Sequence, residues 1–458
     1  MAVLGAGKQG VIHVARNVRQ LRTGNAGERP QTDCGRLGSH GGGIAYSHRT
    51  RVRHADGACH PRTRAVCGHR ARRSWPRAYR SGGSQMTSKS VRLRRIAKHD
   101  RQAAATLERL ISIALRYLPQ AFVDGESVFT LKGMQAGHTW QAVPTGRSLR
   151  YGAVTALGLA RLPYRTQRQV LGGETCSDLV GRLAKGLDEI TSVGDAAMIC
   201  WATAETEHAE LPHALARLAE LQRGDNRPYV VDAAWAVSAL VCARGLLDVE
   251  ADLAHARTRL LGARTGALFP HFTTAGGPWH RAHVGCFADQ VYPVQALARL
   301  HASADDPPAL AVAESVATSI CTAQGSAGQW WWHYDSRTGG VVEGYPVYSV
   351  HQHAMAPMAL LDLADAGGAD HIGAICRGLR WLAEPAETSE ELVLDEPPII
   401  WRKVARGDPR KLVRGLCAAS TRIRPGLRPP ALERIFPPTA VDHECRPYEL
   451  GWLLATWV

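Results

Sequence analysis

The sequence predicts an all-α fold in which six helical hairpins close into a ring, an (α/α)6 toroid. From about residue 105 the apolar residues recur at helical spacing, and no alternating β-branched run is long enough to indicate a sheet. Two kinds of helix also alternate along the chain, one amphipathic and one apolar on all sides. Since a helix that is apolar all round must be buried all round, the first kind is expected to surround the second.

The amphipathic kind is typical of outer, half-solvated helices and includes "CSDLVGRLAKGLDEI", "LPHALARLAELQ", "PALAVAESVATSI" and "DHIGAICRGLRWL". Six helices of the apolar kind are predicted, beginning near Tyr151, Asp195, Asp232, Asp289, Gln352 and Glu449. A repeated outer-to-inner connection would bring their starts to one rim. The polar residues expected at that rim are Arg150, Tyr151, Asp195, Asp232, Asp289, His351, His353, Arg446, Tyr448 and Glu449. Helix capping accounts for Asp195 and Asp232 as well as catalysis does.

The positive charge of the chain is concentrated at its beginning. Residues 1–85 carry a net charge of +13 out of the total of +14, so the rest is nearly neutral and does not indicate a nucleic-acid partner. Residues 1–85 also have too few apolar residues for a core, which predicts a disordered basic leader. We expect the biological chain to begin at Met86, and residues 86–458 to form one toroid domain with a basic insertion at about 384–445.

Cysteine usage and hydropathy bear on the compartment. The eleven cysteines include no CxxC pair, and no uncharged apolar run approaches the length of a membrane span. We therefore expect a reduced, cytoplasmic protein without a transmembrane segment. Residues 402–434 carry ten Lys or Arg against Asp408 and Glu433. Such a run favours a solvated face, a peripheral contact, or attraction of a uronate, a nucleotide sugar or a lipid diphosphate.

The richest candidate site is the stretch "GQWWWHYDSRTGGVVEGYPVYSVHQHAMAP", Gly328 to Pro357. Aromatic side chains present flat faces suited to a sugar ring, while His and carboxylate side chains transfer protons. The predicted catalytic residues are His351, His353, Asp289 and Glu449. The predicted substrate-binding residues are Trp330, Trp331, Trp332, Tyr334, Tyr345, Arg446 and Tyr448. The alternative is that the stretch is a structural plug, with tryptophans that cover a repeat junction.

This arrangement resembles the toroid superfamilies of six-hairpin glycosidases and sugar epimerases, of terpene cyclases, and of protein prenyltransferase β subunits. Gln324, Gly328 and Trp330 in "ICTAQGSAGQW" are placed as in the QW repeat of squalene cyclases, and "LLGARTGALF" resembles a degraded copy. The catalytic motifs of the isoprenoid branch are missing, because there is no DxDD and Asp305 and Asp306 lack the last carboxylate of a DDxxD. A prenyltransferase-like zinc site would have to use Cys286, Asp289 and His351 or His353.

The hypothesis that accounts for most of these residues is that the chain is a carbohydrate-active enzyme of the epimerase, hydrolase or lyase class, in polysaccharide metabolism. It predicts a small-molecule or glycan substrate and no cofactor. One alternative is an isoprenoid-binding or prenyl-transferring toroid with zinc at Cys286, Asp289 and His353. The other is a non-catalytic scaffold. Fold alone does not decide between them.

Overall fold

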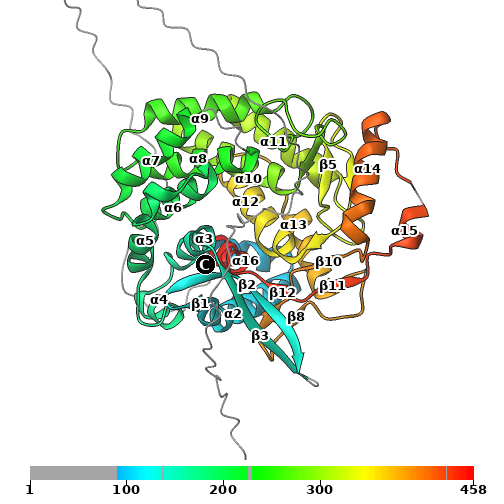
Figure 1. Ribbon diagram of the computed structural model, residues 1–458, viewed down its shortest axis with the longest axis horizontal. Helices are drawn as coiled ribbons and strands as arrows, with labels where there is room; N and C mark the ends of the chain where they lie inside the picture. The colour runs from blue at the N-terminus through cyan, green and yellow to red at the C-terminus, as the bar shows by residue number, and fades with distance from the viewer. Residues whose placement is uncertain (1–89, 137–138, 225–228, 430) are drawn as a thin grey trace, which may run out of the picture. The chain divides into compact units, whose positions relative to one another are not determined.

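The computed structural model describes residues 90–458, apart from 137–138, 225–228 and 430 (Figure 1). The expectations for the leader at 1–85 and for a start at Met86 lie outside these residues. Within the described part, six inner helices follow one another around a ring, and the last one packs against the first. They are α3 (Leu149–Leu159), α6 (Val193–Glu205), α8 (Val230–Ala243), α10 (Ala288–Ala304), α12 (Ala356–Asp365) with the π-helical turn η3 (His351–Met355) before it, and α16 (Pro447–Trp457).

The ring confirms the predicted toroid, and each inner helix begins within two residues of its predicted start. In α8, every side chain from Val230 to Ala243 is buried except that of Cys242. This helix therefore contacts protein on all sides, as its apolar composition requires.

Outer helices pack on the outside of this ring, each against one or two inner helices. They are α2 (Arg101–Tyr117), α5 (Cys176–Ala184), α7 (Leu211–Arg223), α9 (Glu250–Ala263), α11 (Pro307–Thr322) and α13 (Ile372–Ala383). The shorter helices are α1 (Val91–His99), α4 (Tyr164–Val170) and the 3-10 turns η1 (Leu118–Ala121) and η2 (Leu187–Glu189). On α5, the predicted amphipathic pattern is confirmed because Leu179 and Leu183 are buried, although the helix ends at Ala184, before the end of the predicted segment.

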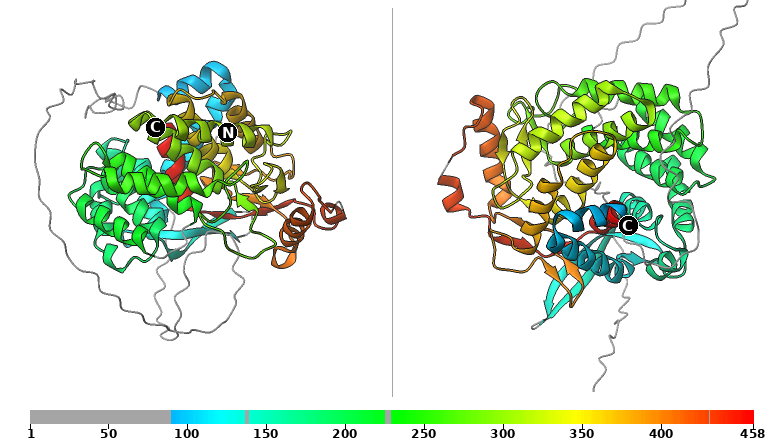
Figure 2. Two further views of the ribbon diagram at one scale, coloured as in Figure 1. Left: turned by 90° about the horizontal axis from the view of Figure 1, so that it is seen from above. Right: turned by 180° about the vertical axis from the view of Figure 1, so that it is seen from behind.

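The helix α16 closes the ring by a close contact with α3. A Cβ atom on Gly158 would lie 2.3 Å from the carbonyl oxygen of Gly451, and one on Gly451 would lie 2.8 Å from the carbonyl oxygen of Val154. Only glycine permits such an approach of two backbones. Figure 2 shows the consequence, since the last helix (red) lies among the first described elements (blue and cyan).

The strands of the structure were not predicted. The hairpin of β2 (Glu126–Ala136) and β3 (Thr139–Arg147) stands between α2 and α3, and β2 also pairs with β1 (Phe122–Val123) and β12 (Glu444–Cys445). The apolar residues of "ESVFTLKGMQA" do not alternate, so this strand lacks the period of two that identifies a half-buried strand.

Three small sheets connect other elements. The first has the order β4 (Val284–Cys286), β5 (His333–Asp335) and β6 (Val341–Glu343). The second has the order β11 (Ala440–Asp442), β10 (Lys403–Ala405) and β7 (Val347–Tyr348). The third pairs β8 (Val393–Leu394) with β9 (Ile399–Ile400).

The predicted basic insertion contains β8 to β12, η4 (Pro409–Lys411), α14 (Leu412–Ile423) and α15 (Ala431–Ile435). It is only partly the expected solvated face, because Arg402 and Arg414 are buried. The Nε of Arg406 also lies 3.2 Å from Oε1 of Glu343, with both side chains about 5% exposed or less. Arg402 and Arg406 are thus paired with carboxyl groups outside the insertion, those of Glu449 and Glu343.

The three residues of the QW-like motif join α11 to α13. The side-chain amide of Gln324 donates to the carbonyl oxygens of Gly328 (2.9 Å) and Ala374 (3.0 Å). A Cβ atom on Gly328, which has φ +103°, would lie 2.2 Å from the carbonyl oxygen of Arg377. Gln324 and Gly328 thus contact α13, and the likeness to a QW repeat stays a resemblance.

Cysteine pairing and membrane-spanning helices can both be checked over the described residues. The eight cysteines among them are all free thiols, and six of the eight are buried. Over the same residues, no helix combines the length and the apolar character that crossing a membrane would demand.

Candidate functional site

The starts of neighbouring inner helices come together at one end of the ring, as predicted. Arg150 of α3 contacts Asp195 of α6, and Gly194 of α6 lies directly against the carboxyl group of Asp232 on α8. The rings of Tyr151 on α3 and Tyr448 on α16 have centroids 4.6 Å apart. We call this end of the ring the rim.

One half of the rim carries two carboxyl groups around an arginine. Nε of Arg150 donates to Oδ1 of Asp195 at 2.6 Å, and its guanidinium lies 4.9 Å from the ring centroid of Trp235. Ser192 caps α6 by accepting from the backbone N–H of Asp195, which leaves the carboxylate of Asp195 for Arg150. Burial raises the pKa of Asp232 to about 6, although Arg150 opposes the shift. Asp232 is therefore a carboxyl group able to exchange protons near neutral pH.

The other half of the rim surrounds Glu449, whose residue surface is 2% exposed. Burial raises the pKa of Glu449 to about 7, against the opposing effects of Arg402 and Arg446. Nε of Arg402 donates to Oε1 of Glu449 at 3.3 Å, and Nη1 of Arg446 lies 3.3 Å from the hydroxyl oxygen of Tyr151. A carboxyl group that is half protonated near pH 7 is suited to general acid or base catalysis.

The rim thus offers proton-carrying carboxyl groups, guanidinium groups and aromatic faces. The guanidinium of Arg446 lies 4.4 Å from the ring centroid of Phe129, which in turn stacks on Tyr151. Arginine binds carboxylates and phosphates through paired hydrogen bonds. The arrangement can therefore orient an anionic polar ligand beside Glu449 and Asp232.

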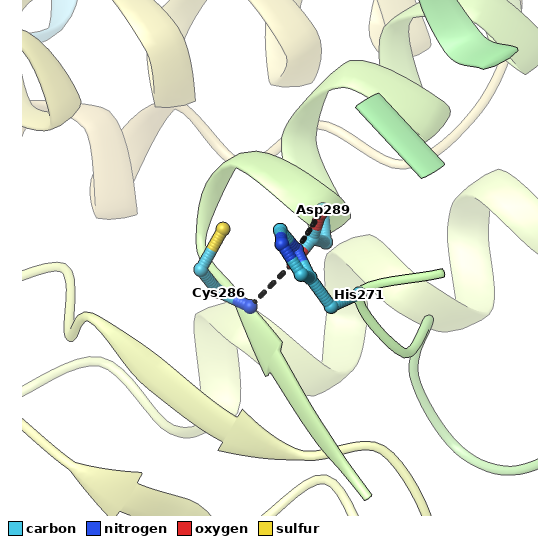
Figure 3. A group of neighbouring side chains, drawn as sticks. All are labelled: His271, Cys286 and Asp289. Carbon is cyan, nitrogen blue, oxygen red and sulfur yellow. Dashed lines mark hydrogen bonds and ion pairs between the residues drawn. The ribbon is translucent and has the colours of Figure 1, made fainter. Parts of the chain in front are cut away.

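A third group at the rim joins α10 to the loop before it (Figure 3). Asp289, in the first turn of α10, is completely buried. Its Oδ2 lies 3.0 Å from Nδ1 of His271 and accepts the backbone N–H of Cys286 at 2.7 Å. The three side chains present one nitrogen, one sulfur and one oxygen atom, all within 4.8 Å of one another.

The structure brings the predicted zinc set together only in part. Cys286 and Asp289 do lie together, but the structure groups them with His271 and not with His353. His353 is in the turn η3 and is completely buried, and its carbonyl oxygen accepts a hydrogen bond from Nε1 of Trp457 at 2.6 Å.

The predicted catalytic roles of His351 and His353 are not supported by their positions. Burial lowers the pKa of both imidazoles to about 3. The ring of His351 packs between Phe287, at 4.4 Å, and Trp332, at 5.7 Å between centroids. Both histidines are therefore neutral core residues. Their catalytic role stays a prediction.

The aromatic stretch is divided between core and surface. Trp330, Trp332 and Tyr334 are buried, and their contacts with a sugar stay a prediction. Trp331 and Tyr345, in contrast, line a cavity of about 210 Å³ together with Arg406 and Arg428. Their role in binding stays a prediction, as do the roles of Arg446, Tyr448, Asp289 and Glu449 at the rim.

Two residues of the rim were missed in the sequence. Arg402 stood in a long basic run, where nothing distinguished it from cations on a solvated face. His271 lies in the irregular segment between α9 and β4, where no periodicity gives its direction. The one available signal was a buried aromatic residue nearby in the sequence, Trp401 directly before Arg402 and Phe269 two residues before His271.

The burial of His353 predicts a specific dependence of stability on pH. Its folded pKa of about 3 lies below the unfolded value of 6.5, so between these values the unfolded chain takes up a proton that the folded chain does not. The contribution to stability is complete above pH 6.5 and is lost as the pH falls. We expect His353→Leu to reduce the pH dependence of the unfolding free energy between pH 6 and pH 4 by about 1.4 kcal/mol per pH unit.

Urea unfolding at several pH values measures this slope. His213→Gln is the control, because the hydrogen bond that the His213 ring donates to Asp188 raises the pKa of this exposed histidine, and its removal should not reduce the acid dependence. An unchanged slope for His353→Leu would mean that His353 titrates normally in the folded protein, and would restore it as a candidate proton carrier.

No protein-family model matches the chain, and no curated protein matches it either. Similar solved structures include an unsaturated glucuronyl hydrolase specific for heparin, 11% identical over 78% of this chain and 96% of that one, with a TM-score of 0.49.

Two further structures are similar at the same level. The unsaturated glucuronyl hydrolase of Streptococcus agalactiae is 9% identical over 81% of this chain and 95% of that one, with a TM-score of 0.49. A polysaccharide lyase is 10% identical over 78% of this chain and 96% of that one, with a TM-score of 0.46. At such identities the activity of this chain has to be argued from its own side chains.

Proposed function

We propose that this chain is a carbohydrate-active enzyme of the epimerase, hydrolase or lyase class, which acts on a glycan or a smaller sugar at the rim. The observation that carries the proposal is the position of Glu449, a buried carboxyl group that lies 3.3 Å from Arg402 and follows Arg446 and Tyr448 at the start of α16. Sugar chemistry of all three classes needs a group that gives or takes a proton beside a ring held in one orientation.

The charges of the rim favour a sugar that bears a carboxylate. Arg402 lies 4% exposed in its side chain, and Arg446 lies 9% exposed. The carboxylates nearest to Arg446 are those of Glu444, at 3.3 Å, and Glu449. Asp442 lies 3.8 Å from Arg402 and 2.8 Å from the Nζ of Lys403. When Glu449 is protonated, the three cations Arg402, Lys403 and Arg446 face the two carboxylates of Asp442 and Glu444, and a uronate would restore the balance. Glu449 would then exchange the proton while Arg446 orients the acid group.

The two rim carboxyl groups have different surroundings. Glu449 is enclosed by arginine and tyrosine side chains, whereas Asp232 faces Arg150 and Asp195. Burial raises the pKa of both groups, so each is a candidate to donate or to accept the proton. A cytoplasmic location and the basic insertion as a peripheral contact remain predictions that accompany this proposal.

The test is a ligand panel of three classes: neutral oligosaccharides, uronate-containing oligosaccharides and prenyl diphosphates. Binding is measured by calorimetry, and products are identified by mass spectrometry. We expect binding and conversion in the uronate class. Glu205→Gln is the matched control, since Glu205 ends α6 at the opposite end of the ring, paired with Arg161, and its loss should leave conversion unchanged.

Other outcomes would decide against this proposal. Binding of prenyl diphosphates alone would favour the isoprenoid alternative, for which the aromatic inner wall of Trp201, Trp235, Tyr292 and Trp452 is the relevant observation. These four rings contact one another and are buried, so they fill the ring rather than line an open channel. No binding in any class would support the scaffold.

A further inference from the structure

We propose that His271, Cys286 and Asp289 form a binding site for one zinc-type divalent ion at the rim, with one coordination position left open. The proposal goes beyond the sugar chemistry above and does not depend on it. It starts from the geometry, because one ligand atom of each side chain lies within 4.8 Å of the other two (Figure 3).

The donor set selects the kind of ion. A thiolate and an imidazole are soft or borderline ligands, which favour zinc over magnesium or calcium, and the carboxylate is also a common zinc ligand. The thiolate and the carboxylate together carry two negative charges, which a divalent ion balances. Three protein ligands with a fourth open position are typical of catalytic rather than structural zinc.

The two segments that carry the ligands are held together by the side chain of Gln290. Its amide oxygen accepts the backbone N–H of Phe269 at 2.9 Å. Its amide nitrogen donates to the carbonyl oxygens of Phe269 at 2.9 Å and Cys286 at 3.2 Å. Gln290 thus fixes the distance between the strand that ends in Cys286 and the segment that leads to His271.

The backbone of these segments is equally constrained. A Cβ atom on Gly285 would lie 2.1 Å from the carbonyl oxygen of Phe269, so only glycine lets the two segments approach this closely. The carbonyl oxygen of His271 accepts the backbone N–H of Val230 at 3.1 Å, which ties this loop to the start of α8. The ligand positions are therefore set before any ion binds, as a specific site requires.

The surroundings of Asp289 suit a ligand rather than an isolated charge. Its Oδ2 accepts the backbone N–H of Cys286, a hydrogen bond that orients the carboxylate toward the other two side chains. The side chain of His271 is 17% exposed, while that of Asp289 has no exposed surface. An ion could therefore enter from the side of His271.

The test uses the full chain, stripped with a chelator and then titrated with Zn²⁺ or Co²⁺. We expect one ion bound per chain by elemental analysis, and with Co²⁺ a near-ultraviolet thiolate-to-metal absorption band. Cys286→Ser should abolish this band, and His271→Ala should lower the affinity by at least about tenfold. Cys376→Ser is the matched control, because Cys376 is a buried cysteine on the outer helix α13 and should leave both signals intact.

The wild-type titration keeps the proposal falsifiable if a variant does not fold. Less than about one-tenth of an ion per chain at saturating Zn²⁺, with no cobalt–thiolate band, would overturn it. A band that persists in folded Cys286→Ser would also overturn it, since another cysteine would then be the ligand. These readouts measure metal content alone, so they stay separate from a failure of the sugar proposal.

Discussion

Replacing Glu449 by glutamine is expected to lower the turnover of the sugar that the panel identifies by about a hundredfold or more, the usual scale for losing a general acid or base. Glutamine keeps the size of the side chain and can still accept the hydrogen bond that Arg402 donates at 3.3 Å. Substrate binding should therefore change little, so the loss should appear in kcat rather than in KM.

The pH profile gives a second readout of the same change. Since burial raises the pKa of Glu449 to about 7, a role as proton donor predicts that the activity of the wild type falls as the pH rises through 7. A role as proton acceptor predicts the opposite limb, a fall as the pH drops through 7. In both cases the residual activity of Glu449→Gln should lack that limb. Full activity with an unchanged profile would remove Glu449 from the chemistry.

Deleting residues 449–458 is expected to abolish the cooperative unfolding of the toroid. The deletion removes most of α16, including Trp452, Leu453 and Trp457, which are buried. The apolar sides of α3 and of the turn η3 would then face solvent, because α16 packs against both. Calorimetry should show no sharp transition. A truncated protein with the melting temperature of the full chain would show that the ring does not depend on its last helix.

A graded version of this test uses the glycine contact between α3 and α16. Gly451→Ala would place a Cβ atom 2.8 Å from the carbonyl oxygen of Val154, so we expect a destabilisation of about 2 kcal/mol. Gly415→Ala is the matched control, since no atom lies within 4 Å of the position of its Cβ in α14. Alanine there should be neutral or stabilise the protein by up to about 1 kcal/mol. If both changes had the same effect on stability, this would argue against a close contact between α3 and α16.

The ring could be predicted because a helix that is buried on all sides consists almost entirely of apolar residues, and such a run is easily recognised in the sequence. The run from Val230 to Ala243 contains almost no polar residue, and only complete burial explains such a helix. The hairpin of β2 and β3 could not be predicted in this way. Its residues contact different neighbours along their length, with Ser127 and Val128 both buried and Met134 exposed, so no simple alternation results.

The site was predictable only where helix periodicity fixed the direction of a side chain. Asp289 and Glu449 each stand in the first turn of an inner helix, and the structure places both at the rim. His353 is also near a helix start, but the π-helical turn η3 directs it into the core. His271 and Arg402 lie in segments whose paths depend on tertiary contacts, such as the hydrogen bonds of Gln290.

The contact between α3 and α16 has a consequence for how the protein is made. Residues 158 and 451 touch, although almost the whole toroid separates them in the chain. Such contacts form late and slow the folding of a domain, and a ribosome releases the N-terminal partner long before the C-terminal one. During synthesis the apolar side of α3 would therefore stay exposed until α16 has been made. A circularly permuted chain that begins with α16 and continues with the elements up to α3 would place the two helices close together in the sequence. Comparing its refolding rate with that of the natural chain would measure the delay.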